Sequence, residues 1–175
     1  MPADDTYDTV LARLQRLEDE HDIAKLIASY GPSVDAGDAD RTAQLWAGDG
    51  TYDVENWQMR GRTAVHDMVS SNAHQKLVAG GCSHFLGPAV VTVTGDAAVA
   101  VCESLVVVRE SDDAERAAGY RVWRAAANHF VLQRIDGRWQ ITARTSRLLN
   151  GDPHAHTLLT AGLAGAAAPH EQREE

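Results

Sequence analysis

The hydrophobic pattern changes its period once along the chain, near residue 82. Before this point, apolar residues recur at helical spacing, as Val10, Leu14 and Leu17 do. After it, long β-branched and aromatic runs are separated by turn signals, which is typical of adjacent strands. Helices followed by antiparallel strands predict an α+β domain with the helices packed on one face of a sheet.

The segment before residue 82 predicts helices and a strand. A long amphipathic helix is expected to bend or end at Gly31-Pro32, because proline lacks a backbone N–H and clashes with the preceding turn. A short second helix is expected after Asp38, whose side chain can cap its free N–H groups. Gly48-Asp49-Gly50 predicts a turn. The expected helices cover residues 7–30, 42–46 and 64–73, and the expected strand covers Thr51–Met59.

The rest of the chain predicts a strand array. Gly95-Asp96 and Asp136-Gly137 each separate two extended runs, which is a strong hairpin signal. The charged segment Ser111–Ala118 is expected to be a loop, and the small-residue tail from Gly151 is expected to cover a rim or to fray. The expected strands cover residues 83–93, 97–109, 119–134 and 138–149.

Composition excludes several classes of protein. The 175 residues suffice for one domain with a core. The net charge of −9 and the scattered basic residues argue against a nucleic-acid partner. No apolar run is long enough to span a membrane, and the acidic start is unlike a secretory signal. With two cysteines, Cys82 and Cys102, the default expectation is a protein of the reducing cytoplasm.

An ordered set of short motifs resembles the SnoaL-like group of the nuclear-transport-factor-2-like (NTF2-like) superfamily. The motifs are Tyr30-x4-Asp35, Leu45-Trp46 with Asp49-x-Thr51-Tyr52, Gly61-Arg62, Ser83-His84-Phe85 and Asp136-Gly137-Arg138-Trp139. The arrangement is most similar to scytalone dehydratase, hexachlorocyclohexane dehydrochlorinase and bile acid 7α-dehydratase. The resemblance implies a cone-shaped, strongly curved, mainly antiparallel sheet with three helices on its concave side. It places this domain over residues 1–150 and leaves 151–175 as a tail that lids the pocket or is disordered.

The resemblance also implies a catalytic pair. The enzymes named above share an aspartate at the end of the first long helix and a histidine at the start of a strand, which match Asp35 and His84. An imidazole is suited to removing a proton from carbon near neutral pH, and a carboxylate behind it fixes its tautomer. In the alternative interpretation, Asp35 caps a turn and His84 is an ordinary half-buried strand residue.

Further candidates surround this pair. The resemblance implies that Tyr30 donates a hydroxyl into the cavity and that Arg144 stabilises developing negative charge, although each has a structural alternative as a core or edge residue. Arg147 competes with Arg144, and alternation along a strand places the two on opposite faces. We expect Glu103 either to be buried, where an arginine would have to pair with it, or to lie on the outer face of the sheet beside solvent. The candidate substrate-binding residues are Tyr52, Trp57, Phe85, Glu103 and Asn128, with His129 facing away from Asn128.

No cofactor or metal is expected. His154-x-His156 lies in a tail without a third ligand nearby, and neither HExxH nor CxxC spacing occurs. Glycine-rich phosphate loops and dinucleotide fingerprints are also absent from the sequence.

Two functions fit these residues. The first is a cofactor-independent lyase, of the dehydratase or dehydrohalogenase type, or an isomerase that acts on a small hydrophobic steroid-, polyketide- or alicyclic-type molecule. The alternative is a non-catalytic ligand-binding or assembly module, in which Pro32 turns Asp35 away from the cavity. A homodimer or homotrimer is expected in either case, because an open sheet rich in valine and alanine usually buries its outer face.

Overall fold

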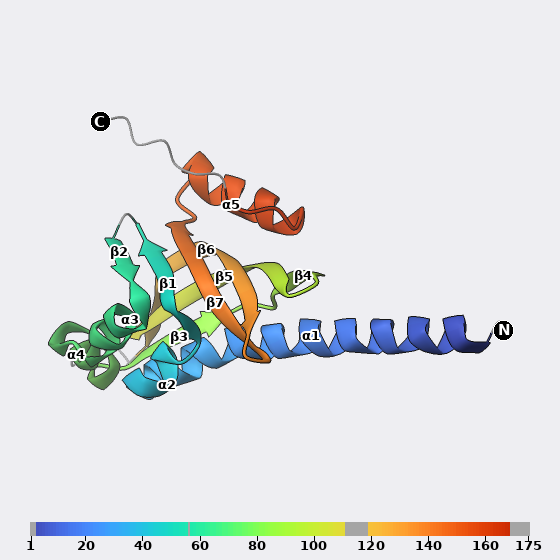
Figure 1. Cartoon of the computed structure of the whole chain (residues 1–175). Coiled ribbons are helices and arrows are strands. Elements are labelled where there is room, and N and C mark those ends of the chain that lie inside the picture. The colour runs from blue at the N-terminus through green and yellow to red at the C-terminus, as the bar shows by residue number, and fades with distance from the viewer. Residues whose placement is uncertain (1–2, 56, 111–118, 169–175) are drawn as a thin grey trace.

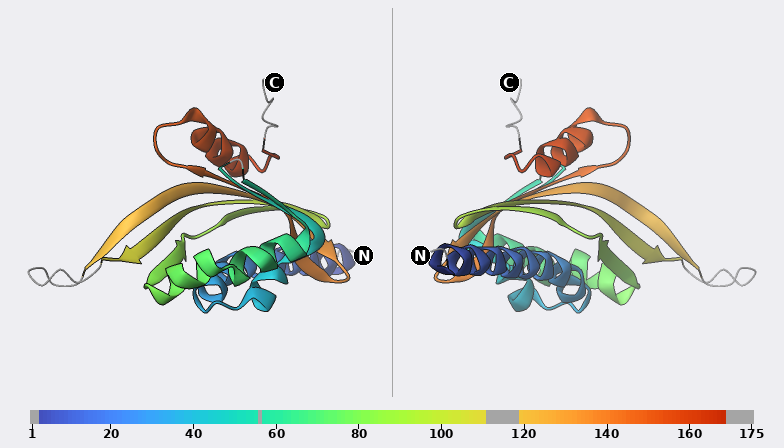
Figure 2. Two further views of the ribbon diagram at one scale, coloured as in Figure 1. Left: turned by 90° about the vertical axis from the view of Figure 1, so that its left-hand side faces the viewer. Right: turned by 90° about the vertical axis from the view of Figure 1, so that its right-hand side faces the viewer.

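The computed structural model describes residues 3–55, 57–110 and 119–168, with side chains from residue 6 onward. A mixed sheet forms the central layer (Figure 1). Helices from the first half of the chain lie on one face of it, and the C-terminal helix lies on the other (Figure 2). The predicted α+β class is thus confirmed. No helix in the described ranges combines the length and apolar character that a membrane span requires.

The helices are α1 (Ala3–Asp35), α2 (Ala39–Ala43), α3 (Gly61–Ser70), α4 (Asn72–Ala79) and α5 (Pro153–Leu163). The strands are β1 (Trp46–Val54), β2 (Trp57–Arg60), β3 (Cys82–Leu86), β4 (Val90–Thr94), β5 (Ala97–Arg109), β6 (Tyr120–Ile135) and β7 (Arg138–Leu148). The predicted loop 111–118 lies outside the described residues.

The strand order is β2-β1-β7-β6-β5-β3, and β4 also pairs with β5. All of these pairings are antiparallel except that of β1 with β7, which is parallel. Both predicted hairpins are present, since Thr94 pairs with Ala97 and Ile135 pairs with Arg138. The long β5–β6–β7 arrangement places the side chains of alternate residues on the helix-covered face, where the core forms.

Of the two outcomes predicted at Gly31-Pro32, a bend or an end, the end does not occur, because α1 continues to Asp35. Pro32 is on the exposed side of the helix, whereas Tyr30 and Val34 are buried in the core. Burial of these flanking side chains offsets the loss of one backbone hydrogen bond. Asp38 caps α2 as predicted, because its Oδ1 accepts a hydrogen bond from the backbone N–H of Arg41 at 2.9 Å.

Three further expectations about local structure were wrong. Gly48-Asp49-Gly50 lies within β1 rather than in a turn, and a Cβ at Gly50 would approach the carbonyl oxygen of Ile141 to 2.7 Å. Gly50 therefore permits the close, irregular pairing of β1 with β7. The expected strand 83–93 is divided into β3 and β4, with Gly87-Pro88 between them. The extra helix α4 was missed.

The C-terminal segment also differs from expectation, because residues 153–163 form α5. Ala155 and Leu158 of α5 pack against Ala127 of β6, and the carbonyl of Ala166 accepts a hydrogen bond from His129 Nε2 at 2.8 Å. This helix covers the sheet face opposite the other helices (Figure 2). None of its residues lines the cavity on the helix-covered face. The part of the tail after residue 168 lies outside the described residues.

Candidate active site

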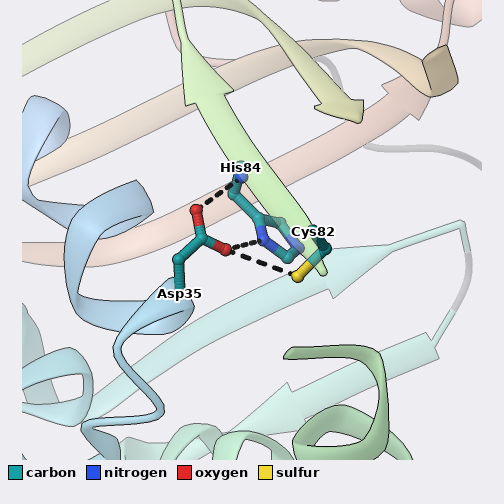
Figure 3. A group of neighbouring side chains, drawn as sticks. All are labelled: Asp35, Cys82 and His84. Carbon is teal, nitrogen blue, oxygen red and sulfur yellow. Dashed lines mark hydrogen bonds and ion pairs between the residues drawn. The ribbon is translucent and has the colours of Figure 1, made fainter. Parts of the chain in front are cut away.

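Asp35 and His84 are in direct contact. The Oδ1 atom of Asp35 lies 2.6 Å from His84 Nδ1, and its Oδ2 atom accepts a hydrogen bond from the backbone N–H of His84 at 2.7 Å (Figure 3). The carboxylate thus holds both the side chain and the backbone of the histidine. A carboxylate only accepts hydrogen bonds, so Nδ1 carries the proton and Nε2 carries the lone pair of the neutral imidazole.

The end of α1 and the start of β3 bring this pair together. Asp35 is the last residue of α1, and His84 is in the middle of β3, which packs against that helix. Gly31 makes the close approach possible, because a Cβ at this position would overlap with the backbone carbonyl of His84. The Gly31-Pro32 dipeptide therefore allows the contact that proline was expected to disrupt.

The electrostatics of the pair favour an ionised Asp35. Partial burial disfavours the charge, but the hydrogen bonds from the side chain and backbone of His84 outweigh it, so the pKa of Asp35 lies below its usual value. The Cys82 thiol also donates to Asp35 Oδ1, at 3.7 Å. Burial and the Asp35 charge raise the pKa of Cys82 to about 11, so this residue is a neutral thiol rather than a nucleophile.

His84 forms part of the wall of a cavity of about 170 Å³ between the sheet and the helices. Tyr30, Tyr52, Trp57, Asn128 and Arg144, which we predicted as site residues, line the same cavity. Asp35 lies behind His84 and does not line it. The remaining lining is largely apolar and includes Met59, Met68, Leu86, Leu105, Val106 and Trp123.

Two arginines line this cavity: Arg124, which pairs with Glu55, and Arg144, which is buried. The Nε and Nη2 atoms of Arg144 donate to Asn128 Oδ1 at 3.3 and 2.8 Å. Its guanidinium carbon lies 4.2 Å from the ring centroid of Tyr30 and 4.5 Å from that of Tyr52. Among the described residues Arg144 has no carboxylate partner, and its buried Nη1 atom has no hydrogen-bond partner. An unsatisfied buried donor is costly unless a ligand uses it.

Tyr30 lies between Arg144 and His84. Its ring is edge-on to that of His84, with 6.5 Å between the centroids. Burial and the neighbouring Tyr52 raise the pKa of Tyr30, so its hydroxyl stays protonated and can donate a hydrogen bond.

Two predicted site residues lie elsewhere. Phe85 is exposed, because it is adjacent to His84 on β3 and therefore points to the opposite face. Glu103 is also exposed, so it is not the partner of Arg144, and its alternative position on the outer face is the correct one. Arg144 and Arg147 do point to opposite faces, and Arg147 forms a two-point ion pair with Asp53 at 3.1 Å.

Sequence reasoning missed several contributors to the site. Ser146 Oγ donates to Asn128 Oδ1 at 2.6 Å, and Asn128 Nδ2 donates to Ser104 Oγ at 2.8 Å. Ser146 could have been found from its spacing of two residues from Arg144 on one strand. The contact of His74 with His84, whose tilted rings have centroids 5.8 Å apart, comes from the unpredicted helix α4 and had no sequence signal.

Asp35, Cys82 and His84 also present ligand atoms within 4.8 Å of one another, a cluster that could hold a metal ion. However, the 2.6 Å separation of Oδ1 and Nδ1 is shorter than the roughly 3.3 Å between ligands on a tetrahedral zinc ion. This geometry fits a shared proton better than a metal.

A larger cavity, of about 370 Å³, lies on the other face of the sheet, beside α5. Its polar lining includes the Asp53–Arg147 ion pair and His129. The Asp53 carboxylate is used by Arg147, and the Nε2 atom of His129 donates to the Ala166 carbonyl, so among the described residues no carboxylate holds His129 as Asp35 holds His84. The chemistry is therefore concentrated at the smaller cavity.

Comparisons with known proteins agree with this fold. Residues 15–145 match the model of the SnoaL-like domain. A crystal structure of an NTF2-like protein with a cystatin-like fold from Novosphingobium aromaticivorans is 40% identical, with a TM-score of 0.80, over 86% of this chain and 94% of that chain.

Two more distant structures share the fold. A proposed scytalone dehydratase from Novosphingobium aromaticivorans is 18% identical, with a TM-score of 0.60, over 76% of this chain and 85% of its own. A proposed dehydratase of the NTF2-like family from Streptomyces avermitilis is 17% identical, with a TM-score of 0.59, over 75% of this chain and 96% of its own. The search of curated proteins gave no match. The domain match and the 40% identity together show that the chain belongs to the SnoaL-like family and has the NTF2-like fold.

Proposed function

We propose that the protein is a cofactor-independent lyase or isomerase whose general base is His84. Its substrate would be a small hydrophobic molecule of the steroid, polyketide or alicyclic type. The observation that carries this proposal is the 2.6 Å contact between Asp35 and His84 at the wall of a largely apolar cavity. Distant structural neighbours that are proposed dehydratases support the reaction class.

In the proposed step, His84 Nε2 removes a proton from a carbon atom of the substrate. Asp35 keeps the lone pair on Nε2 and stabilises the imidazolium that forms. Negative charge then develops on an oxygen, or on a departing hydroxyl or halide. Arg144 Nη1 has no other partner, so it would donate to that atom, and the Tyr30 hydroxyl would assist.

Substitution of the pair tests the base. His84→Gln and Asp35→Asn should lower kcat on hydrophobic β-hydroxy ketones or alicyclic halides, and general-base catalysis predicts a loss of about 10²–10⁴-fold for His84→Gln. His66→Gln, at a histidine of α3 that does not line the cavity, is the matched control and should keep full activity. Unchanged activity of His84→Gln would exclude His84 as the base.

A further readout separates catalysis from ligand binding. In D₂O, unreacted substrate should gain deuterium at the carbon that loses its proton, and His84→Gln should abolish this exchange. Tight binding without turnover or exchange would instead support the non-catalytic module.

A further inference from the structure

The N-terminal half of α1 projects beyond the body of the domain (Figure 1). Residues 6–18 are all exposed. Contact with the body begins at Asp19, whose Oδ1 atom accepts a hydrogen bond from Trp139 Nε1 at 3.2 Å and pairs with Arg134 at 2.7 Å. The helix is therefore fixed at Asp19 and extends from there into solvent.

The projecting segment carries an apolar stripe, which we define as Tyr7, Val10, Leu14 and Leu17. Each of these side chains is 50–63% exposed. Their spacing alternates between three and four residues, which is the pattern of the a and d positions of a coiled coil. Leu11, also exposed, flanks the stripe. In a helix whose neighbouring side chains are polar, this pattern indicates a surface for pairing with another helix.

The apolar stripe faces away from the body of its own subunit. At about 100° per residue, its mean direction is roughly 150° from that of the buried residues Ile23, Ile27 and Tyr30. A second helix can therefore lie along the stripe without meeting the domain that α1 belongs to. Two domains would then be on opposite outer sides of a central helix pair.

A helix that projects alone into water needs stabilisation, because isolated helices of this length are marginal. We propose that a second copy of this chain supplies it, so that two α1 helices pair in parallel through the apolar stripe and form a homodimer. With Tyr7 at position a, Arg13 falls at g and Glu18 at e. In a parallel pair, Arg13 then lies opposite Glu18 of the partner subunit, and the charges are complementary.

The molar mass in solution tests the pairing. Light scattering and sedimentation velocity over a concentration series should give the mass of two chains for the wild type and of one chain for Leu14→Glu/Leu17→Glu. Leu163→Glu is the matched control, because Leu163 is equally exposed but lies on α5, and it should keep the dimer. Circular dichroism would verify that all variants are folded. The proposal would be overturned if the wild type were monomeric, with or without binding to anionic vesicles. It would also be overturned if the dimer survived the double substitution.

A cysteine crosslink tests the parallel direction. In a parallel, in-register pair each d position faces its own copy, so Leu17→Cys should form a disulfide-linked dimer under mild oxidation. The wild type, which retains Cys82 and Cys102, is the control and should stay uncrosslinked. If the double substitution dissociates the dimer but Leu17→Cys forms no crosslink, the parallel arrangement is overturned.

Discussion

The backbone carbonyl of His84 packs against Gly31 so closely that a side chain at position 31 has no room. This contact joins α1 to β3 four residues before Asp35, and it sets the distance across which the carboxylate reaches the imidazole. A residue with no chemical role thus determines whether the candidate catalytic pair can form.

Gly31→Ala should therefore separate Asp35 from His84. The added methyl group would push β3 away, and overpacking of this kind costs about 1–3 kcal/mol in the free energy of unfolding. Chemical denaturation measures that loss. Gly48→Ala is the matched control, since a Cβ at Gly48 meets nothing within 4 Å, and it should leave stability unchanged. Equal stability of the two variants would show that β3 can move freely.

Asn128→Ala should destabilise the protein strongly. Asn128 Oδ1 accepts hydrogen bonds from both Arg144 and Ser146, and its loss would leave a buried cation with the aromatic rings as its main support. Because hydrogen bonds to charged groups contribute about 1.5–3 kcal/mol each, we expect a loss of about 3 kcal/mol. Ser146→Ala removes one neutral donor and should cost only about 1 kcal/mol. Comparable losses for the two variants would contradict this assignment.

Stability should decline as the pH falls below about 6.5, because of His129. Burial lowers the pKa of His129 below its usual value near 6.5, so the unfolded chain binds a proton more readily than the folded one. The contribution of neutral His129 to the free energy of unfolding is complete above pH 6.5. It is lost as the pH falls through the lower pKa of the folded state. His129→Gln should flatten this part of the stability profile, whereas His156→Gln, on the exposed side of α5, should not.

A second decline should occur below about pH 4, because of Asp35. The hydrogen bonds from His84 outweigh the effect of burial and lower the pKa of Asp35 in the folded state. Asp35 therefore adds to the free energy of unfolding above its unfolded-state pKa, near 3.8. This contribution is lost as the pH falls through the lower pKa of the folded state. The difference in unfolding free energy between wild type and Asp35→Asn should shrink as the pH falls below about 5. A constant difference would show that Asp35 titrates alike in both states.

The fold was largely predictable because strand alternation and hairpin turns are local signals. The bounds of β5 coincide with the predicted strand, and Asp38 caps α2 as its side chain suggests. Position 31 shows where local reasoning fails. Gly31-Pro32 has the composition of a helix end, yet the contacts of Tyr30 and Val34 with residues distant in sequence keep the helix intact.

In the candidate site too, local sequence signals predict some features, and contacts between residues distant in sequence decide the others. Alternation along β7 predicts correctly that Arg144 and Arg147 face opposite sides, but it does not say which of them points into the cavity. The surroundings decide this, because Tyr30 and Tyr52 provide ring faces for Arg144, and Asp53 provides a carboxylate for Arg147. The contact between Asp35 and His84, which are 49 positions apart, was expected only from the family resemblance.

The absence of a carboxylate beside Arg144 within the described part of the chain has a consequence for selectivity. A chain of net charge −9 repels a ready-made anion as it approaches from solution. Inside, an uncompensated guanidinium stabilises an anion once it exists. Under the proposed function, these opposed fields would favour molecules that arrive neutral and acquire charge only while they react.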